Sequence, residues 1–136
     1  MADNAVIEVR RVESLAEVGE PLEQVATVLY FLLTSLLKQK EGLLHAEHRR
    51  PQSEVTWYVR PRADGNEGHD GPVAILPAAI LQSCTARMAM ALDLSHIEGG
   101  YRKAVFSLEG RRHECSVYVS NCRQSGCWMR IYARAI

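Results

Sequence analysis

No charge of one sign predominates in this sequence, in which 16 Lys and Arg side chains balance 16 Asp and Glu side chains. Proteins that bind nucleic acid usually carry a basic excess, because neutralising phosphates supplies much of their affinity. We therefore do not expect nucleic acid as the partner. The best candidates for a local basic patch, which a solvated strand face explains more simply, are Arg49, Arg50, Arg60 and Arg62.

Long apolar runs are also missing. The longest run, over residues 25–37, is interrupted by threonine and serine. It is shorter than the stretch of about 20 apolar residues that a membrane-spanning helix needs. The first ten residues carry three charged side chains and lack the apolar centre of a signal peptide. We therefore expect no membrane insertion and a cytoplasmic location.

Closely paired cysteines are absent. The four cysteines form no C-x-x-C pair and stand at Cys84, Cys115, Cys122 and Cys127. Zinc sites in small domains usually use tightly paired ligands, so we expect reduced thiols and no metal site. Cys115 lies two residues from His113, which is the one local pairing suited to a nucleophilic thiol. Most structural cysteines are inert, and we do not expect this pair to be reactive.

The common signatures of catalysis and phosphate binding are missing as well. The glycine-rich stretch over residues 65–71 has no lysine, so it is no P-loop, and no G-x-S-x-G or H-E-x-x-H segment occurs. His45, Glu47 and His48 form one polar cluster that metal binding or acid–base chemistry would suit. On a strand, however, His48 would face away from the other two. We expect a polar surface there, with no catalytic residue and no cofactor.

The composition indicates one globular domain. Hydrophobic residues make up 47% of the 136 residues and charged residues 24%, which is ordinary for a chain with its own core. We expect a single α+β domain over residues 21–136. Residues 1–20 are expected to be an N-terminal extension or a short strand, because residues 5–12 alternate weakly between apolar and charged side chains.

Two helices are predicted from apolar residues at i, i+3, i+4 and i+7. The first covers residues 21–40, with Pro21 in its first turn and Gly42 as its C-cap. The second covers residues 77–92, and its alanines allow close packing on a sheet.

Alternating patterns predict four strands, over residues 54–62, 101–108, 112–120 and 128–133. A polar loop is expected to follow the first strand and to extend to Gly71. Short connections join the last three strands, so we expect antiparallel neighbours. This order predicts an α+β fold made of an antiparallel sheet with helices packed mainly on one face.

Five segments resemble, in the same order, the PAS-like N-terminal domain that precedes the motor domain in type II secretion and type IV pilus ATPases. They are L-H-A-E at 44–47, Y-V-R-P-R-A-D-G at 58–65, R-M-A-M-A-L-D-L at 87–94, Y-V-S at 118–120 and M-R-I at 129–131. The resemblance covers residues 21–136. It implies a PAS-like fold and a role beside a secretion or pilus motor.

The departures from that family bear on function. The sequence given ends at Ile136, where the ATPase domain of the family would begin, and the Walker motifs are not part of it. Family arginines that reach toward the nucleotide of the motor are replaced by Thr85 and by residues 98–101. Each replacement removes a guanidinium that would contact phosphate. The resemblance therefore implies a domain that keeps the fold and has lost nucleotide sensing.

We expect a non-catalytic regulatory or adaptor domain that binds a protein partner, either a secretion or pilus component or a second copy of the chain. Aromatic residues and arginine are enriched at binding hot spots. The candidate binding residues are Trp57, Tyr58, Arg60, Arg62, Asp64 and Arg130. The alternative is a small-ligand or nucleotide sensor, because PAS-like folds often hold ligands between sheet and helix. Arg60, Arg62 and Arg130 would suit a phosphate in such a ligand.

Overall fold

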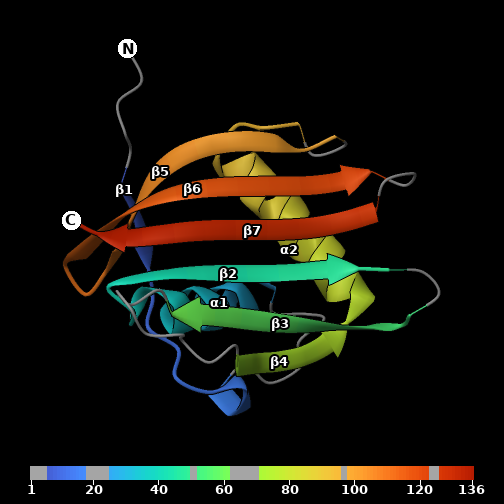
Figure 1. The fold of residues 1–136 in the computed structure, drawn as a ribbon, viewed down its shortest axis with the longest axis horizontal. Coiled ribbons are helices and arrows are strands. Elements are labelled where there is room, and N and C mark those ends of the chain that lie inside the picture. Colours follow the sequence, from blue (N-terminus) through green and yellow to red (C-terminus); the bar gives the residue numbers. More distant parts are fainter. Residues whose placement is uncertain (1–5, 18–24, 50–51, 62–70, 96–97, 123–125) are drawn as a thin grey trace.

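The computed structural model of the chain describes residues 6–17, 25–49, 52–61, 71–95, 98–122 and 126–136. Their elements run in the order β1 (Val6–Val9), a 3-10 helix (Leu15–Glu17), α1 (Val25–Leu37), β2 (Glu41–His48), β3 (Glu54–Pro61), β4 (Gly71–Pro77), α2 (Ala78–Ala91), β5 (Gly100–Leu108), β6 (Arg111–Cys122) and β7 (Gly126–Ala135). Figure 1 shows the strands side by side, with both α-helices behind them.

The described strands form one mixed sheet in the order β1-β5-β6-β7-β2-β3-β4. Five neighbouring pairs are antiparallel, whereas β1 runs parallel to β5, with Val6 beside Val105 and Val9 beside Leu108. The α+β class is confirmed, but the expectation of a purely antiparallel sheet is wrong. The chain passes through both helices and three strands between β1 and β5. Such a long connection allows a parallel pair, which a tight hairpin does not.

β2 is a central strand that the sequence patterns missed. The expected helix C-cap at Gly42 is wrong, because α1 ends at Leu37 and Gly42 lies within β2. The expected helix start at Pro21 lies outside the described residues. A Cβ on Gly42 would stand 3.3 Å from both the Arg60 carbonyl oxygen and Leu36 Cδ1. Glycine therefore allows α1 to approach β2 closely.

β4 is a second strand without a sequence signal, and it forms an edge of the sheet. It fills the gap between the expected polar loop and the expected second helix. Its pairing with β3 contains a bulge, since Trp57 is opposite Ala74 and Tyr58 is opposite Pro72. Proline cannot donate a ladder hydrogen bond, so prolines within β4 suit an edge strand.

Both helices lie against the same face of the sheet, which we call the covered face. The Thr85 hydroxyl of α2 lies 3.6 Å from Cys127 Sγ of β7. Gly42, next to Leu36 of α1, is opposite Ala133, which shares one face of β7 with Cys127. The largest fully buried side chains of the sheet are Trp57, Phe106, Leu44, Met129, Ile131 and His113.

α1 is buried around most of its circumference because the segment after β1 crosses its outer side. The Val12 N–H donates a hydrogen bond to Thr34 Oγ1 at 3.1 Å. The Arg10 guanidinium lies 5.7 Å from the centre of the Tyr30 ring. A helix with so many apolar faces is expected to be covered on several sides. Among the described helices, none has the length and apolar character required to cross a membrane.

Candidate binding surface on the open sheet face

The face of the sheet opposite the helices is the candidate functional surface, and we call it the open face. Side chains of a strand alternate between the two faces. In β7 the buried residues Cys127, Met129, Ile131 and Ala133 alternate with residues of the open face, which are Trp128, Arg130, Tyr132 and Arg134. Figure 1 is viewed onto this face, and no described element crosses it.

The strand register places ten residues of the open face in two adjacent rows across β5, β6, β7, β2 and β3. The first row is Lys103, Ser116, Tyr132, Leu43 and Arg60. The second row is Tyr101, Tyr118, Arg130, His45 and Tyr58. We call these ten residues the central band. They come from segments far apart in the sequence, and the sheet order alone brings them together.

Three tyrosines form a continuous aromatic cluster in the central band. The ring centres of Tyr101 and Tyr118 are 4.5 Å apart, and those of Tyr118 and Tyr132 are 6.2 Å apart in an edge-to-face contact. Side chains of Tyr101 and Tyr132 remain 44% and 43% exposed. Edge-to-face and tilted contacts suit the quadrupole of the rings. The cluster thus holds large, partly exposed aromatic surface in fixed positions.

The other half of the central band is also ordered by ring contacts. His45 stacks on Tyr58, with ring centres 5.2 Å apart and planes inclined by 18°. The Arg130 guanidinium lies 5.3 Å from the centre of the Trp128 ring, one residue row away from the band. A cation over an aromatic face is attracted by the ring quadrupole. Arg130 is therefore held in place and remains exposed.

Charges are distributed unevenly over the open face. The ten residues of the central band include three cations, Lys103, Arg130 and Arg60, and no Asp or Glu. The neighbouring rows carry the acids, and these have basic partners. Glu114 lies 3.9 Å from Arg134, and Glu41 is directly opposite Arg134 in β7. At the other end, Glu47 lies 3.3 Å from Arg49. A cationic aromatic centre is thus bordered by mixed charge.

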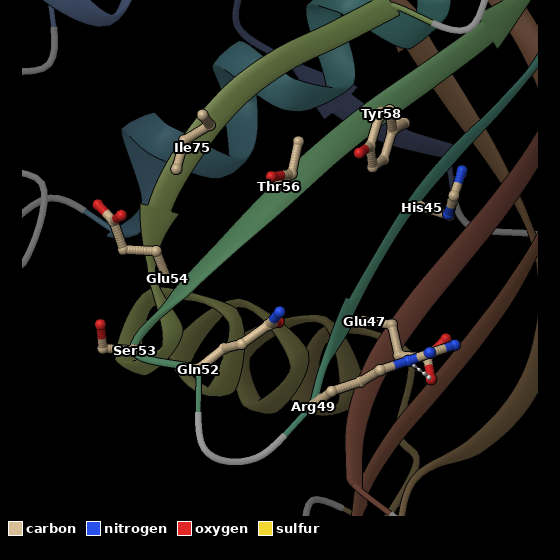
Figure 2. A pocket seen from close by; sticks show the side chains of 9 residues that line it. All are labelled: His45, Glu47, Arg49, Gln52, Ser53, Glu54, Thr56, Tyr58 and Ile75. Carbon is tan, nitrogen blue, oxygen red and sulfur yellow. Dashed lines mark hydrogen bonds and ion pairs between the residues drawn. The ribbon is translucent and has the colours of Figure 1, made fainter.

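A hollow of about 740 Å³ lies at the Glu47 end of the open face. Figure 2 shows the side chains that line it from β2, β3, β4 and the connection before β3. They are His45, Glu47, Arg49, Gln52, Ser53, Glu54, Thr56, Tyr58 and Ile75. Two carboxylates and one guanidinium face this hollow. Its described lining therefore suits a polar or cationic group better than a phosphate.

The residues proposed from the sequence are only partly brought together. Tyr58, Arg60 and Arg130 all belong to the central band. Trp57 is fully buried on the covered face, so its ring cannot contact a partner on the open face. Arg62 and Asp64 lie outside the described residues.

Seven residues of the central band are not among the six candidate binding residues named from the sequence. They are Leu43, His45, Tyr101, Lys103, Ser116, Tyr118 and Tyr132. Alternation within β5, β6 and β7 was a signal that Tyr101, Tyr118 and Tyr132 are not in the core. Their adjacency to Tyr58 could not be inferred, because β2 was not recognised as the strand that joins the two halves of the sheet.

The polar cluster around His45 is arranged as the strand alternation predicts. His45 and Glu47 both line the hollow, whereas His48 Nε2 lies 2.6 Å from the Gln52 carbonyl oxygen. No group of three or more His, Cys, Asp and Glu side chains suited to a metal ion occurs in the described parts of the chain.

The thiols of Cys84, Cys115 and Cys127 lie in the core and favour the protonated form. Burial raises the pKa of Cys84 and of Cys115 to about 12, and it also raises the pKa of Cys127. The thiolate is the nucleophilic form, so these groups are poor nucleophiles at neutral pH. His113 next to Cys115 is itself fully buried, and its Nε2 lies 3.0 Å from the Gln39 carbonyl oxygen.

No protein-family model matches the chain, and no curated protein matches it in sequence. The resemblance to secretion and pilus ATPases stays a prediction.

Proposed function

We propose that the chain is a non-catalytic adaptor or regulatory domain whose protein partner docks on the central band of the open face. The supporting observation is the cluster of Tyr101, Tyr118 and Tyr132 beside the exposed Arg130, with mixed charges around it. Protein interfaces commonly combine a centre of aromatic residues and arginine with a polar rim.

The size of the open face is adequate for such an interface. Five strands at a spacing of about 4.8 Å cover roughly 24 Å, and four residue rows about 6.8 Å apart cover roughly 27 Å. The product is about 650 Å², close to the ~800 Å² per partner that a typical stable complex buries. The central band with one row on each side is therefore large enough to bind one partner without help from the covered face.

The partner to test first is a secretion or pilus motor, because of the resemblance described above. Four of its five segments overlap the strands that carry the central band, at residues 44–47, 58–65, 118–120 and 129–131. A PAS-like arrangement of the helices and sheet is part of this proposal. We expect Arg130→Ala to weaken binding of the motor and Met90→Ala, on α2, to leave it unchanged. Equal binding of both variants would contradict docking on the central band.

A selection from a random peptide library displayed on phage tests the binding surface without assuming a partner. Peptides selected on the wild-type protein are expected to bind Arg130→Ala and Tyr132→Ala at least about tenfold more weakly, as hot-spot residues predict. The matched control is Met90→Ala, since Met90 is 73% exposed on the helix side. A selection that yields no peptides, or only peptides that are sensitive to Met90→Ala and insensitive to the band variants, would refute the proposal.

The hollow next to Glu47 supports a second candidate, a small-ligand sensor. Its volume of about 740 Å³ is within the range of ligand sites in proteins. Glu47 and Glu54 favour a cationic ligand over a nucleotide. Bound ligand would raise the melting temperature by mass action. A thermal-shift screen with polyamines and nucleotides separates the two classes, and a nucleotide-specific shift would contradict this assignment of charge.

A further inference from the structure

We infer that the partner segment that binds the central band is acidic, with Asp or Glu side chains placed between apolar ones. This inference rests on the proposed function and extends it to the chemistry of the partner. The ten residues of the band include three cations and several aromatic side chains, but no Asp or Glu, and the inference is based on this combination.

The positions of the three cations specify a spacing. Lys103 and Arg60 stand at the two ends of the first row, and Arg130 stands in the middle of the second row. Each neighbouring pair is separated by two strands and one row, which corresponds to about 12 Å between backbones. In an extended peptide this distance is covered by about three to four residues. We therefore expect acids at every third or fourth position of the bound segment.

The strands between the cations carry mainly aromatic and apolar side chains. Tyr118 and Ser116 of β6 lie between Lys103 and Arg130 in the strand order. Leu43 and His45 of β2 lie between Arg130 and Arg60. These groups provide surface for the residues between the acids of the partner. Arg130 is well suited to bind a carboxylate, because its guanidinium is already held over Trp128 and can form two parallel hydrogen bonds.

A second copy of the chain fits the central band poorly. Two bands placed face to face would bring Lys103, Arg130 and Arg60 of each copy close to cations of the other, and like charges across an interface are strongly unfavourable. The acids nearest to these cations lie in the neighbouring rows, where Glu114 and Glu47 already have arginine partners at 3.9 Å and 3.3 Å.

A nucleic acid strand fits less well than an acidic protein segment. A sugar–phosphate backbone carries a negative charge at every nucleotide and would extend beyond the three cations of the band. It would also run beside Glu41 and Glu114, in the row on one side of the band, and Glu47, in the row on the other side. The formal net charge of the whole chain is zero, so no long-range attraction compensates. An acidic segment of about ten residues can place its charges only where the cations lie.

The peptides selected on the wild-type protein provide the first test. Peptides that depend on Arg130 and Tyr132 are expected to be rich in Asp and Glu at the spacing given above. If they depend on these residues but are neutral or basic, the acidic inference is overturned and docking on the open face is retained. If they do not depend on these residues, the proposed function itself fails.

Charge inversion provides the second test and uses three peptides. The first is the selected peptide that binds most tightly; the second has Asn and Gln in place of its acids, and the third has Lys at the same positions. By fluorescence anisotropy in 50 mM salt, we expect the wild-type protein to bind the acidic peptide at least tenfold more tightly than the amide version. The preference should shrink at 500 mM salt, because ions screen exposed charges.

The double variant Lys103→Glu/Arg130→Glu should prefer the Lys peptide over the acidic one. The matched control is Arg87→Glu/Arg111→Glu, which changes the net charge equally at exposed sites off the open face and should behave as wild type. An unchanged preference in the band variant, or an inverted one in the control, would overturn the inference. Tighter binding of a twelve-nucleotide oligothymidine than of the acidic peptide, or a band-dependent dimer in sedimentation experiments, would also overturn it.

Discussion

Replacing Trp57 separates a role in the core from a role in binding. Trp57 and Tyr58 are adjacent in β3 but lie on opposite faces, since Trp57 is fully buried and Tyr58 stacks on His45. Truncation of a buried tryptophan to alanine costs about 3–5 kcal/mol, through lost burial and the cavity that remains. The total stability of a domain is about 5–15 kcal/mol. Trp57→Ala should therefore remove a large part of the free energy of unfolding.

Two further variants make the prediction specific to the environment of the indole. Trp57 Nε1 is buried and has no hydrogen-bond partner among the described residues. Trp57→Phe removes this unpaired donor, which offsets the smaller ring, because a buried unsatisfied group costs about 1–3 kcal/mol. We expect Trp57→Phe to lie within about 1 kcal/mol of wild type. Tyr58→Ala loses one ring contact of about 0.5–1.5 kcal/mol and little burial.

Urea unfolding followed by far-UV circular dichroism measures these differences, and the selected peptides report on binding by the same variants. We expect Trp57→Phe to bind as wild type and Tyr58→Ala to bind more weakly. The reasoning would be refuted if Trp57→Ala kept wild-type stability while losing peptide binding. It would also be refuted if Trp57→Phe lost more than about 2 kcal/mol, because that would mean that the indole N–H has a partner.

Three other changes test the packing and the charges of the core. Gly99→Ala should prevent stable folding, because its Cβ would stand 2.1 Å from the Val119 carbonyl oxygen. Gly110→Ala is the control, because Gly110 has a similar φ of 81° but no atom within 4 Å of the added Cβ. By urea unfolding, this control should lose only about 1–2 kcal/mol of stability. Thr34→Val should cost about 1–3 kcal/mol by the same assay, because it leaves the buried Val12 N–H without its acceptor, and an unchanged midpoint would contradict this. Stability should fall as the pH rises above 9: burial raises the pKa of Cys84 from 9.0 to about 12, so the native state keeps a proton that the unfolded state loses. Cys84→Ala should reduce that slope by about 1.4 kcal/mol per pH unit, and an unchanged slope between pH 9 and 11 would contradict the shift.

The strands and helices with strong local signals were predictable from the sequence. The patterns over residues 101–108, 112–120 and 128–133 coincide with β5, β6 and β7, and the expected second helix coincides with α2. The Glu109-Gly110 turn between β5 and β6 has φ values of 52° and 81°. Positive φ at both central residues is typical of a tight hairpin turn that matches the strand twist. In these segments local and long-range preferences agree.

β1, β2 and β4 were harder to predict for different physical reasons. β1 has four residues, and its partner β5 lies almost one hundred residues away. β4 is short and contains two prolines. β2 begins with Glu41-Gly42 shortly after the apolar helix α1, which ends at Leu37, and a glycine so close to the end of a helix usually serves as its C-cap. Gly42 is explained by the close approach of the Leu36 side chain, and not by a helix-ending turn. This contact forms only in the folded protein, so the local sequence does not reveal it.

The alternation of apolar and polar residues in β3 was sufficient to predict which candidate residues are buried. Trp57 alternates in phase with Val55 and Val59, both of which are buried, so its place in the core follows from the apolar side of the strand. Tyr58 and Arg60 are in the opposite phase and belong to the open face. Alternation thus separates the two sets. It does not reveal which strands are neighbours in the sheet, and the central band forms only because five particular strands are neighbours.

The binding surface depends on the core through the strand register. β2 pairs with β3 on one side and β7 on the other, with His45 opposite both Tyr58 and Arg130. A slip of one residue would turn Leu44 and Ala46 to solvent and His45 and Glu47 toward the helices, which burial strongly disfavours. The apolar side chains of the covered face therefore fix the register. The same register fixes the spacing of Lys103, Arg130 and Arg60, so the surface that we propose for an acidic partner is specified by residues that the partner never touches.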